Sequence, residues 1–380
     1  MDRERKETES MQITFILGNG FDIGLGLKTG YNSFYKEYCK ITGKENANIA
    51  DFKNMLSKRQ EDEVKRVIDW ADFEKAFGQH SEDFTIAEKN AYIERFEDFV
   101  ATFNEYLENE EKLADYSKNG AIGRMMKNAV TRYFQIRTED RDAVQNIYNG
   151  IQGQRIYNFI SFNYTKSVDQ CAQRLKEYIK SELHREVGEI LHIHGFIEEN
   201  MIMGVNDPSQ ITNPDFANDF DVVREIVKPN QNSDIRANYE KQVLDCINRS
   251  DVICVYGMSI GETDKKWWKA IAKWLAKSNN HALVILKYDT AYNKRFPFKQ
   301  VKFINAVVDN FLSLSEQSDE VKDLIRTRVF VGMNHNVFEM NLRKKPSDGY
   351  DTIIEVAEHV GDAVEYTEKN TETLTKLLSI

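Results

Sequence analysis

The sequence predicts an α/β fold built on a parallel sheet. Short apolar runs, bounded by glycine or polar residues, recur along the chain and are typical of strands buried on both faces. Several of these runs are followed by a loop and then a helical pattern, and this alternation favours parallel pairing. Residues 31–154, between the first two runs, show instead the pattern of amphipathic helices. We therefore expect a Rossmann-like parallel sheet with a large helical insertion between its first two strands.

Five apolar runs are expected to form the strands of this sheet. They are Ile13–Leu17, Tyr157–Phe162, Ile190–Ile193, Val252–Tyr256 and Ala282–Leu286. A further strand-like piece, Arg328–Val331, lies beyond the last of them.

The helical stretch predicts how the chain divides into domains. Its apolar residues recur at steps of three and four, as in Tyr92, Phe96, Phe99 and Phe103, so each helix has one stripe that must be buried against a partner. We expect residues 11–30 and 155–315 to form one discontinuous Rossmann-like domain, with 31–154 as an inserted helical module. Residues 316–380 would form a C-terminal extension that includes a helix from Thr352–Ala363 onward.

Composition and charge exclude several classes of protein. Hydrophobic residues make up 41% of the 380 and charged residues 29%, which is enough apolar material to fill a core. The net charge of -10 argues against a general nucleic-acid binder, although a local basic groove stays possible. The four cysteines form no CxxC pair, and no apolar run approaches the roughly 20 residues of a membrane helix. The charged opening MDRERKETES is unlike a secretory signal, so we expect a cytoplasmic protein without a membrane segment.

A glycine-rich turn follows the first predicted strand directly. Its residues include Gly18, Asn19, Gly20, Asp22 and Gly26. Closely spaced glycines that end a strand and open a helix let a ligand approach the backbone, and the N–H groups at the helix start can face a phosphate. Asp22 suits the hydroxyl donors of a ribose better than a phosphate, because like charges repel. The alternative is a tight strand-to-helix connection that binds nothing.

Two further strand ends carry polar groups. Asn163 follows the second strand, and His192 and His194 close the third. Ligands of open α/β sheets lie over the carboxyl ends of the strands, so these groups and the glycine turn should border one crevice. Two histidines could form half of a metal site, but no cysteine or carboxylate cluster completes one, and we expect no metal. Either histidine could instead act as a base, or both could be satisfied in a polar pocket.

The fourth strand ends in a second turn of small residues. Gly257 and Ser259 are plausible contacts for the other half of a dinucleotide. Trp267 and Trp268 follow on the next helix and are expected to pack in the core rather than to stack on a base.

In this order the four segments resemble the bacterial AbiH-like abortive-infection family and, more distantly, sirtuin-like NAD-binding domains. The resemblance spans roughly residues 11 to 290. Its blocks are GNGFDIGLGLKTGY (Gly18–Tyr31), FNYT (Phe162–Thr165), HIHG (His192–Gly195) and YGMSIGETD (Tyr256–Asp264). The segment Trp70–Glu74 also resembles an acidic-aromatic helix of that family, and it can equally be an ordinary amphipathic helix.

The sirtuin-like resemblance implies roles for individual residues. Gly18–Gly20 lies where that pattern has its phosphate cradle, and Gly26 where it has a glycine before a proline. Asn163 matches an asparagine that contacts the nicotinamide ribose, and His194 matches the catalytic histidine. The turn with Gly257 and Ser259 matches a later Gly-Ser turn.

Three positions depart from the sirtuin-like pattern. Lys28 replaces the proline, Asp22 replaces a serine, and Thr165 replaces an aspartate. The paired CxxC zinc module of protein deacylases is also missing. These departures speak against lysine deacylation and leave cleavage of NAD as the implied chemistry.

The resemblance thus implies a phage-defence effector that hydrolyses NAD, as substrate rather than cofactor, at the nicotinamide–ribose bond. Asn163 would hold a ribose hydroxyl or the attacking water, and His194 would accept a proton from it. Because unrestrained NAD hydrolysis would harm the host, we expect a homo-oligomer or a trigger protein to control it. A catalytically silent sensor that binds NAD or ADP-ribose is the main alternative. A nuclease-type toxin would need clustered carboxylates and a basic face, which the sequence does not plainly offer.

Overall fold

The computed structural model describes residues 10–344 except 41–45, 63–69, 134–135, 152, 198, 200, 293–294 and 336. The helix expected from Thr352–Ala363 onward therefore lies outside the described residues. Within the described part of the chain, no helix is both long and apolar enough to cross a membrane.

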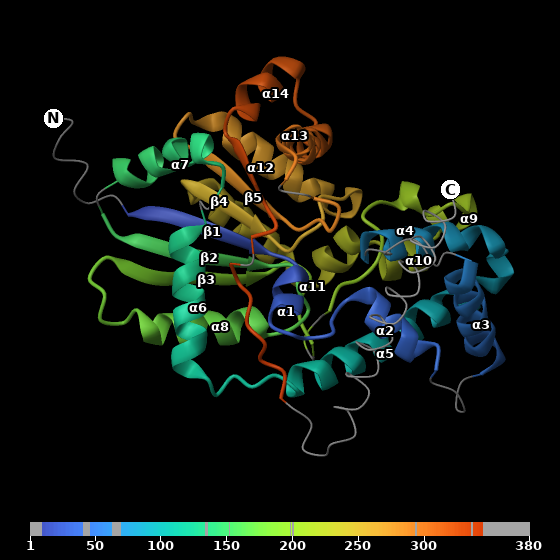
Figure 1. The fold of residues 1–380 in the computed structure, drawn as a ribbon. Helices are drawn as coiled ribbons and strands as arrows, with labels where there is room; N and C mark the ends of the chain where they lie inside the picture. The colour runs from blue at the N-terminus through green and yellow to red at the C-terminus, as the bar shows by residue number, and fades with distance from the viewer. Residues whose placement is uncertain are drawn as a thin grey trace, which may run out of the picture. The chain divides into compact units, whose positions relative to one another are not determined.

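The predicted parallel sheet is confirmed (Figure 1). Its six strands are β1 (Met11–Leu17), β2 (Arg155–Ser161), β3 (Arg185–His192), β4 (Val252–Tyr256), β5 (Ala282–Lys287) and β6 (Val329–Met333). All pair in parallel, in the order β3-β2-β1-β4-β5-β6. This is the order of dinucleotide-binding folds, in which the connections reverse direction between β1 and β4.

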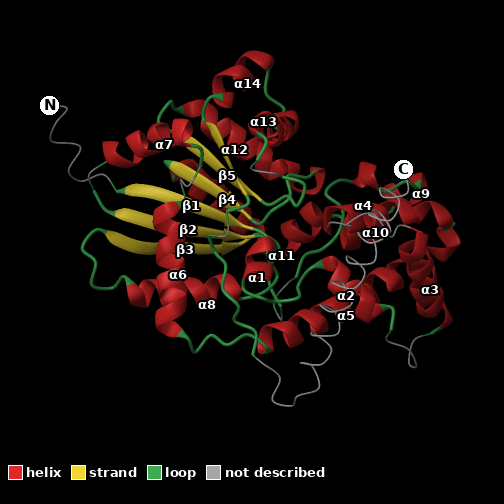
Figure 2. Ribbon diagram, in the orientation of Figure 1, coloured by secondary structure: helices red, strands yellow, loops and turns green. Residues whose placement is uncertain are grey.

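Helices make up most of the remaining structure (Figure 2). Between β1 and β2 lie α1 (Gly20–Gly24), α2 (Tyr31–Tyr38), α3 (Ala47–Asp62), α4 (Trp70–His80), α5 (Lys89–Lys112), α6 (Asn119–Arg132) and α7 (Thr138–Gly150). After β2 come α8 (Ser167–Tyr178), α9 (Pro214–Ala217), α10 (Phe220–Ile226), α11 (Lys228–Arg249), α12 (Lys265–Lys277), α13 (Pro297–Leu314) and α14 (Asp319–Arg326).

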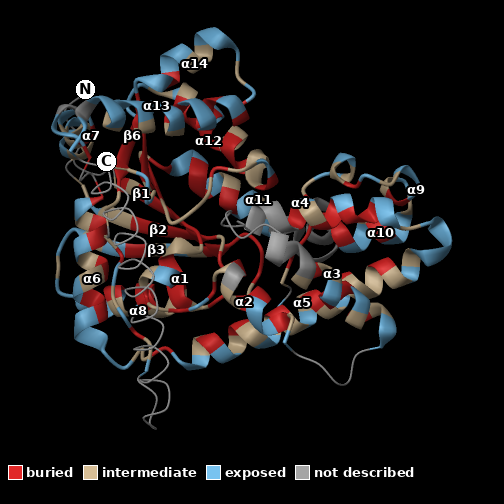
Figure 3. Cartoon of the chain, turned by 45° about the vertical axis from the view of Figure 1, so that its right-hand side comes forward, coloured by how far each residue is buried: buried red, intermediate tan, exposed pale blue. Residues whose placement is uncertain are grey.

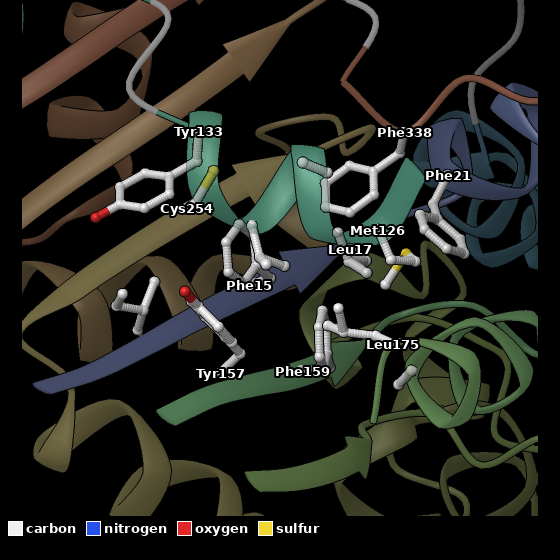
Figure 4. Close-up of a cluster of buried hydrophobic side chains, with 14 of the residues drawn as sticks. Phe15, Leu17, Phe21, Met126, Tyr133, Tyr157, Phe159, Leu175, Cys254 and Phe338 are labelled. Atoms are coloured by element: carbon white, nitrogen blue, oxygen red, sulfur yellow. The ribbon is translucent and has the colours of Figure 1, made fainter. Parts of the chain in front are cut away.

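Each face of the sheet is covered by its own set of helices, and the strands are buried throughout their centre (Figure 3). On one face, side chains of β1 pack with α6, α7 and α8. Figure 4 shows Phe15 of β1 between Tyr133, Tyr157, Phe159 and Phe338 on this face. The opposite face of β1 presents Ile16 to a second core, which contains α11, α12, α13 and α14. Trp268 and Trp274 of α12 are fully buried in it.

A third apolar cluster lies beyond the carboxyl ends of the strands. It is built from α2, α3, α4 and α5 together with α9 and α10, and aromatic side chains such as Phe34, Phe99 and Phe103 fill it. In Figure 1 the strand arrowheads point toward these helices. The helices of residues 31–154 therefore pack in two places, because α6 and α7 cover the sheet while α2 to α5 form the separate cluster. Residues from 197 to 227 complete that cluster from another part of the chain.

A segment after β6 crosses back over the first helix. The N–H groups of Met340 and Leu342 donate to the carbonyls of Gly24 and Leu25, both at 2.8 Å. We call residues 337–342 the C-terminal strap. Its one large aromatic side chain, Phe338, is fully buried against the sheet.

Candidate active site

A cavity opens at the carboxyl ends of β1, β2, β3 and β4. It encloses about 760 Å³ of space, counting solvent at its mouth. Of the residues predicted from the sequence, seven line it: Gly18, Asn19, Asp22, Asn163, His194, Gly257 and Ser259. Four segments that follow β1, β2, β3 and β4 and lie far apart in the sequence thus meet at one site, as expected for a parallel sheet whose strand ends share one edge.

Gly20 and Gly26 are not among the cavity-lining residues, and both have close backbone or side-chain neighbours instead. The N–H of Gly20 donates to Gly257 O at 2.7 Å, and a Cβ on Gly20 would lie 2.4 Å from Gly257 Cα. Gly26 has φ +84° and faces Asn341 of the C-terminal strap. The N–H of Gly18 also donates to a backbone carbonyl, that of Tyr256, at 3.0 Å. The two turns are therefore held backbone to backbone, and these N–H groups are not available to a phosphate.

Asp22 is buried in the first turn. Its Oδ2 accepts a hydrogen bond from the Thr165 hydroxyl at 2.7 Å, whereas Oδ1 has no hydrogen-bond partner. Burial raises the pKa of Asp22 to about 6, although Thr165, Ser167 and Asn163 each oppose the rise. The carboxyl can therefore exchange a proton near neutral pH.

Asn163 is the residue that the second strand delivers to the cavity. It is buried, and neither its Oδ1 nor its Nδ2 forms a hydrogen bond of good geometry, although the amide lies close enough to Asp22 to lower the pKa of that carboxyl. A buried amide left in this state costs free energy, and such groups in native proteins call for an explanation. The neighbouring cavity supplies one, because a bound polar ligand could pair with both amide atoms.

His194 lies in the same cavity, beside a carboxylate. Its Nε2 is 3.4 Å from Asp264 Oδ1, its Nδ1 has no partner, and its ring meets that of Phe162 edge-on at 5.4 Å. Burial and the nearby Lys228 ammonium lower the pKa of His194, and Asp264 opposes them. The imidazole is therefore neutral near pH 7 and able to accept a proton. Burial pulls the pKa of Asp264 upward, but His194 and Lys228 outweigh it and leave the pKa below its usual range.

His192 has different surroundings from His194. Its Nε2 lies 2.7 Å from Asp169 Oδ2 on α8, and its ring packs on Phe196. It does not line the cavity. Within the described residues, no three His, Cys, Asp or Glu side chains are grouped so that they could hold a metal ion.

A buried ion pair, which the sequence did not predict, completes the polar wall of the cavity. Lys228 at the start of α11 donates to Glu74 Oε2 of α4 at 2.7 Å. Burial raises the pKa of Glu74, and Lys228 opposes that rise. Glu74 belongs to the acidic-aromatic segment singled out above, whose residues 70–73 have side chains outside the described part. Lys228 belongs to no motif, so only the fold could place it here.

The cavity is acidic overall. Its charged lining residues are Asp22, Glu74, Asp264 and Lys228, so carboxylates outnumber ammonium groups by three to one. Phe103, Leu107 and Met258 add an apolar wall. Such a site favours a polar ligand that carries or develops positive charge beside a flat or apolar group.

The fold and the site define an α/β protein with the strand order of dinucleotide-binding folds and a cavity at the point where that order reverses. Comparison with known families gives the more particular assignment. The family described as "Bacteriophage abortive infection AbiH" matches residues 14–286, and the chain belongs to this family. The family resemblance predicted from the sequence is confirmed, and with it a role in phage defence by abortive infection. A search of curated proteins found no match. The sirtuin-like resemblance stays a prediction.

Proposed function

We propose that this protein contributes to abortive infection by hydrolysing NAD at the nicotinamide–ribose bond. One observation carries the proposal: the amide of Asn163, the Nδ1 of His194 and the Oδ1 of Asp22 are buried around one cavity at the strand ends, and none of them forms a hydrogen bond of good geometry. Unpaired buried polar groups of this kind suit a ligand rich in hydroxyl groups, such as a ribose.

The residues of the cavity match the needs of this hydrolysis. Water attacks C1′ of the ribose, the C1′–N bond breaks, and its electron pair leaves with nicotinamide, which becomes neutral. The proton of the water passes to the neutral imidazole of His194. Positive charge develops on the ribose in the transition state, as in glycosyl transfer generally, and the carboxylates of Asp22 and Asp264 stabilise it.

The same charges suggest which half of NAD the cavity receives. A pyrophosphate would meet more carboxylates than ammonium groups there, and the N–H groups of Gly18 and Gly20 are already paired. The nicotinamide carries a positive charge in NAD and presents a flat ring. We therefore assign the cavity to the nicotinamide riboside half, with Phe103 and Leu107 against the ring.

The experiment follows nicotinamide release from NAD by chromatography, with purified protein alone and with phage-infected lysate. We expect His194→Gln to lower the rate by about 100- to 10,000-fold, the usual effect of removing a general base. Asn163→Ala should lose turnover as well. His192→Gln is the matched control, because it changes the same side chain two positions away and outside the cavity. Circular dichroism confirms that each variant is folded.

Two results would contradict the proposal. One is a folded His194→Gln protein that releases nicotinamide at the wild-type rate. The other is wild-type protein that releases none under either condition.

A second candidate is a sensor that binds NAD or ADP-ribose without turnover. It is favoured by Thr165, which stands where the sirtuin-like pattern has an aspartate and which already donates its hydroxyl to Asp22. Isothermal titration separates the two candidates, because the sensor would bind NAD tightly while no nicotinamide appears in the solution.

A further inference from the structure

Helix α12 carries a row of lysines on its outer side. Its sequence, KKWWKAIAKWLAK, contains five lysines and no acidic residue. Lys265, Lys269, Lys273 and Lys277 follow one another at steps of four, so they lie along one face at intervals of roughly 6 Å. The opposite face, with Trp268 and Trp274, is buried in the core. The helix therefore has a fixed orientation that holds the lysines outward.

These lysines border a groove that is separate from the acidic cavity. The groove measures about 950 Å³, counting open solvent, and α11 forms its other wall. Leu244, Ile247 and Ala270 give it an apolar floor, while Asn206 and Asn248 add amide groups. We call it the lysine groove. None of its described lining residues is aromatic.

The positive charge of the lysine groove is only partly balanced. Glu316 pairs with both Lys265 and Lys269, at 3.2 and 2.6 Å, and Glu240 pairs with Lys266 at 2.5 Å. Lys277 donates to the neutral amide of Asn248. Among the described residues, Lys273 has no polar partner. Counted over the described residues, five lysines line the groove and two glutamates pair with them, which leaves three excess positive charges on a chain whose net charge is -10.

We propose that the lysine groove binds the sugar–phosphate backbone of a single-stranded nucleic acid. An ordinary solvated helix face interleaves both signs of charge, whereas α12 has only one. Its row of four lysines is about 18 Å long and evenly spaced, which suits the regular phosphates of a nucleic-acid strand. Because lysine–phosphate contacts would dominate and no described lining residue is aromatic, binding would depend only weakly on sequence.

The acidic net charge of the chain does not exclude this binding. The net charge of -10 determines the electrostatic field far from the chain. A nucleic-acid strand in contact with α12 instead interacts mainly with charges within a Debye length of about 8 Å. Lys265, which lines the groove, directly follows Asp264, which lines the acidic cavity. The two sites nevertheless have opposite charge and need different ligands.

The test measures fluorescence anisotropy of labelled 20-nucleotide DNA and RNA strands with the full chain, without NAD, from 50 to 200 mM salt. We expect binding at 50 mM salt. The logarithm of the binding constant should fall linearly with the logarithm of the salt concentration, with a slope of about -2 to -3.5 for three to five phosphate contacts. Comparison of the two strands shows whether DNA or RNA is preferred. Because NAD is absent, the outcome does not depend on the proposed hydrolysis.

Two triple variants separate the groove from general charge. Lys269→Glu/Lys273→Glu/Lys277→Glu should weaken binding at least tenfold and reduce the slope by about 2. The control Lys176→Glu/Lys180→Glu/Lys302→Glu changes net charge equally at exposed lysines outside the groove and should bind within twofold of wild type. If the first variant does not fold, the triple glutamine variant replaces it, with an expected loss of at least fivefold.

Three results would overturn the proposal. The first is that the wild type does not bind at 50 mM salt. The second is that the groove variant and the control variant lose the same affinity. The third is that polyglutamate displaces the labelled strand as well as unlabelled DNA does at the same concentration of negative charge.

Discussion

The burial of Asp22 makes the stability of the fold depend on pH. Its pKa is raised to about 6 by burial, whereas a carboxyl of this type in the unfolded chain titrates near 3.9. Between these values the folded protein holds a proton that the unfolded chain has released, so stability falls as pH rises through this window. Above pH 6 the loss is complete and amounts to about 3 kcal/mol.

Replacing this carboxyl by an amide should remove the pH-dependent loss. Asn has an oxygen that can accept the Thr165 hydroxyl, and it never ionises. We expect Asp22→Asn to raise the free energy of unfolding by up to about 3 kcal/mol at pH 7.5 and to change it little at pH 4. Urea unfolding at the two pH values measures the difference, with Asp245→Asn at an exposed acid as control. An equal gain at both pH values would contradict the assigned ionisation.

Residues of the cavity differ in how well the sequence predicts them. Asn163 and His194 could be found because each follows an apolar strand, and parallel strands end at one edge. The sequence predicts Gly20 as a phosphate contact, because it cannot show that the N–H of Gly20 donates to the carbonyl of Gly257. Glu74 and Lys228 are 154 residues apart on two helices, and helical periodicity does not encode which helices meet.

At the scale of elements, the central strands were the easiest to predict. Val252–Tyr256 was predicted with its observed bounds, because β4 lies inside the sheet and is apolar on both faces. The predicted strand at Ile190–Ile193 starts five residues later than β3 itself, since β3 is an edge strand and begins with two polar residues, the half-buried Arg185 and the exposed Glu186. The sequence pattern of α6 did not reveal that it covers the sheet, because an apolar stripe does not identify its partner.

The C-terminal strap fixes the element that carries Asp22. Besides its two backbone hydrogen bonds to α1 and the residue after it, the strap inserts Phe338 between Phe21 of α1 and Tyr256 of β4, with ring centroids at 5.4 and 5.0 Å. We expect Phe338→Ala to lower the free energy of unfolding by about 3–5 kcal/mol, because it leaves a cavity in a packed core. Phe298→Ala removes the same side chain where it is 83% exposed and should change stability by less than about 0.5 kcal/mol.

Urea unfolding of both variants tests the strap. Hydrogen exchange adds a local readout, since the amides of Met340 and Leu342 should exchange faster in the Phe338 variant. Equal stability of the two variants would show that the strap does not hold α1.

At the scale of the whole molecule, the ion pair between Glu74 and Lys228 joins the helical cluster to the region around the sheet. Glu74 comes from α4, whereas Lys228 begins α11, which packs on the sheet, and both side chains are at most 7% exposed. A buried pair of this kind adds little net stability compared with apolar groups, but losing one partner leaves an uncompensated charge. We therefore infer that the ion pair fixes the relative position of α4 and α11 at the cavity more than it adds to stability.

A double-mutant cycle tests this interpretation. Lys228→Met should lower the free energy of unfolding by about 3–5 kcal/mol, because Glu74 is left buried without its counter-ion. Adding Glu74→Leu should recover most of that loss, since the two apolar side chains can pack where the charges were. The exposed pair of Lys322 and Asp319 provides the control cycle, whose coupling should stay below about 1 kcal/mol. If the two cycles give the same coupling energy, the pair near the cavity is no more than a surface contact. A large coupling would instead mean that each of the two charges is tolerated in the wall of the cavity only while its partner is present.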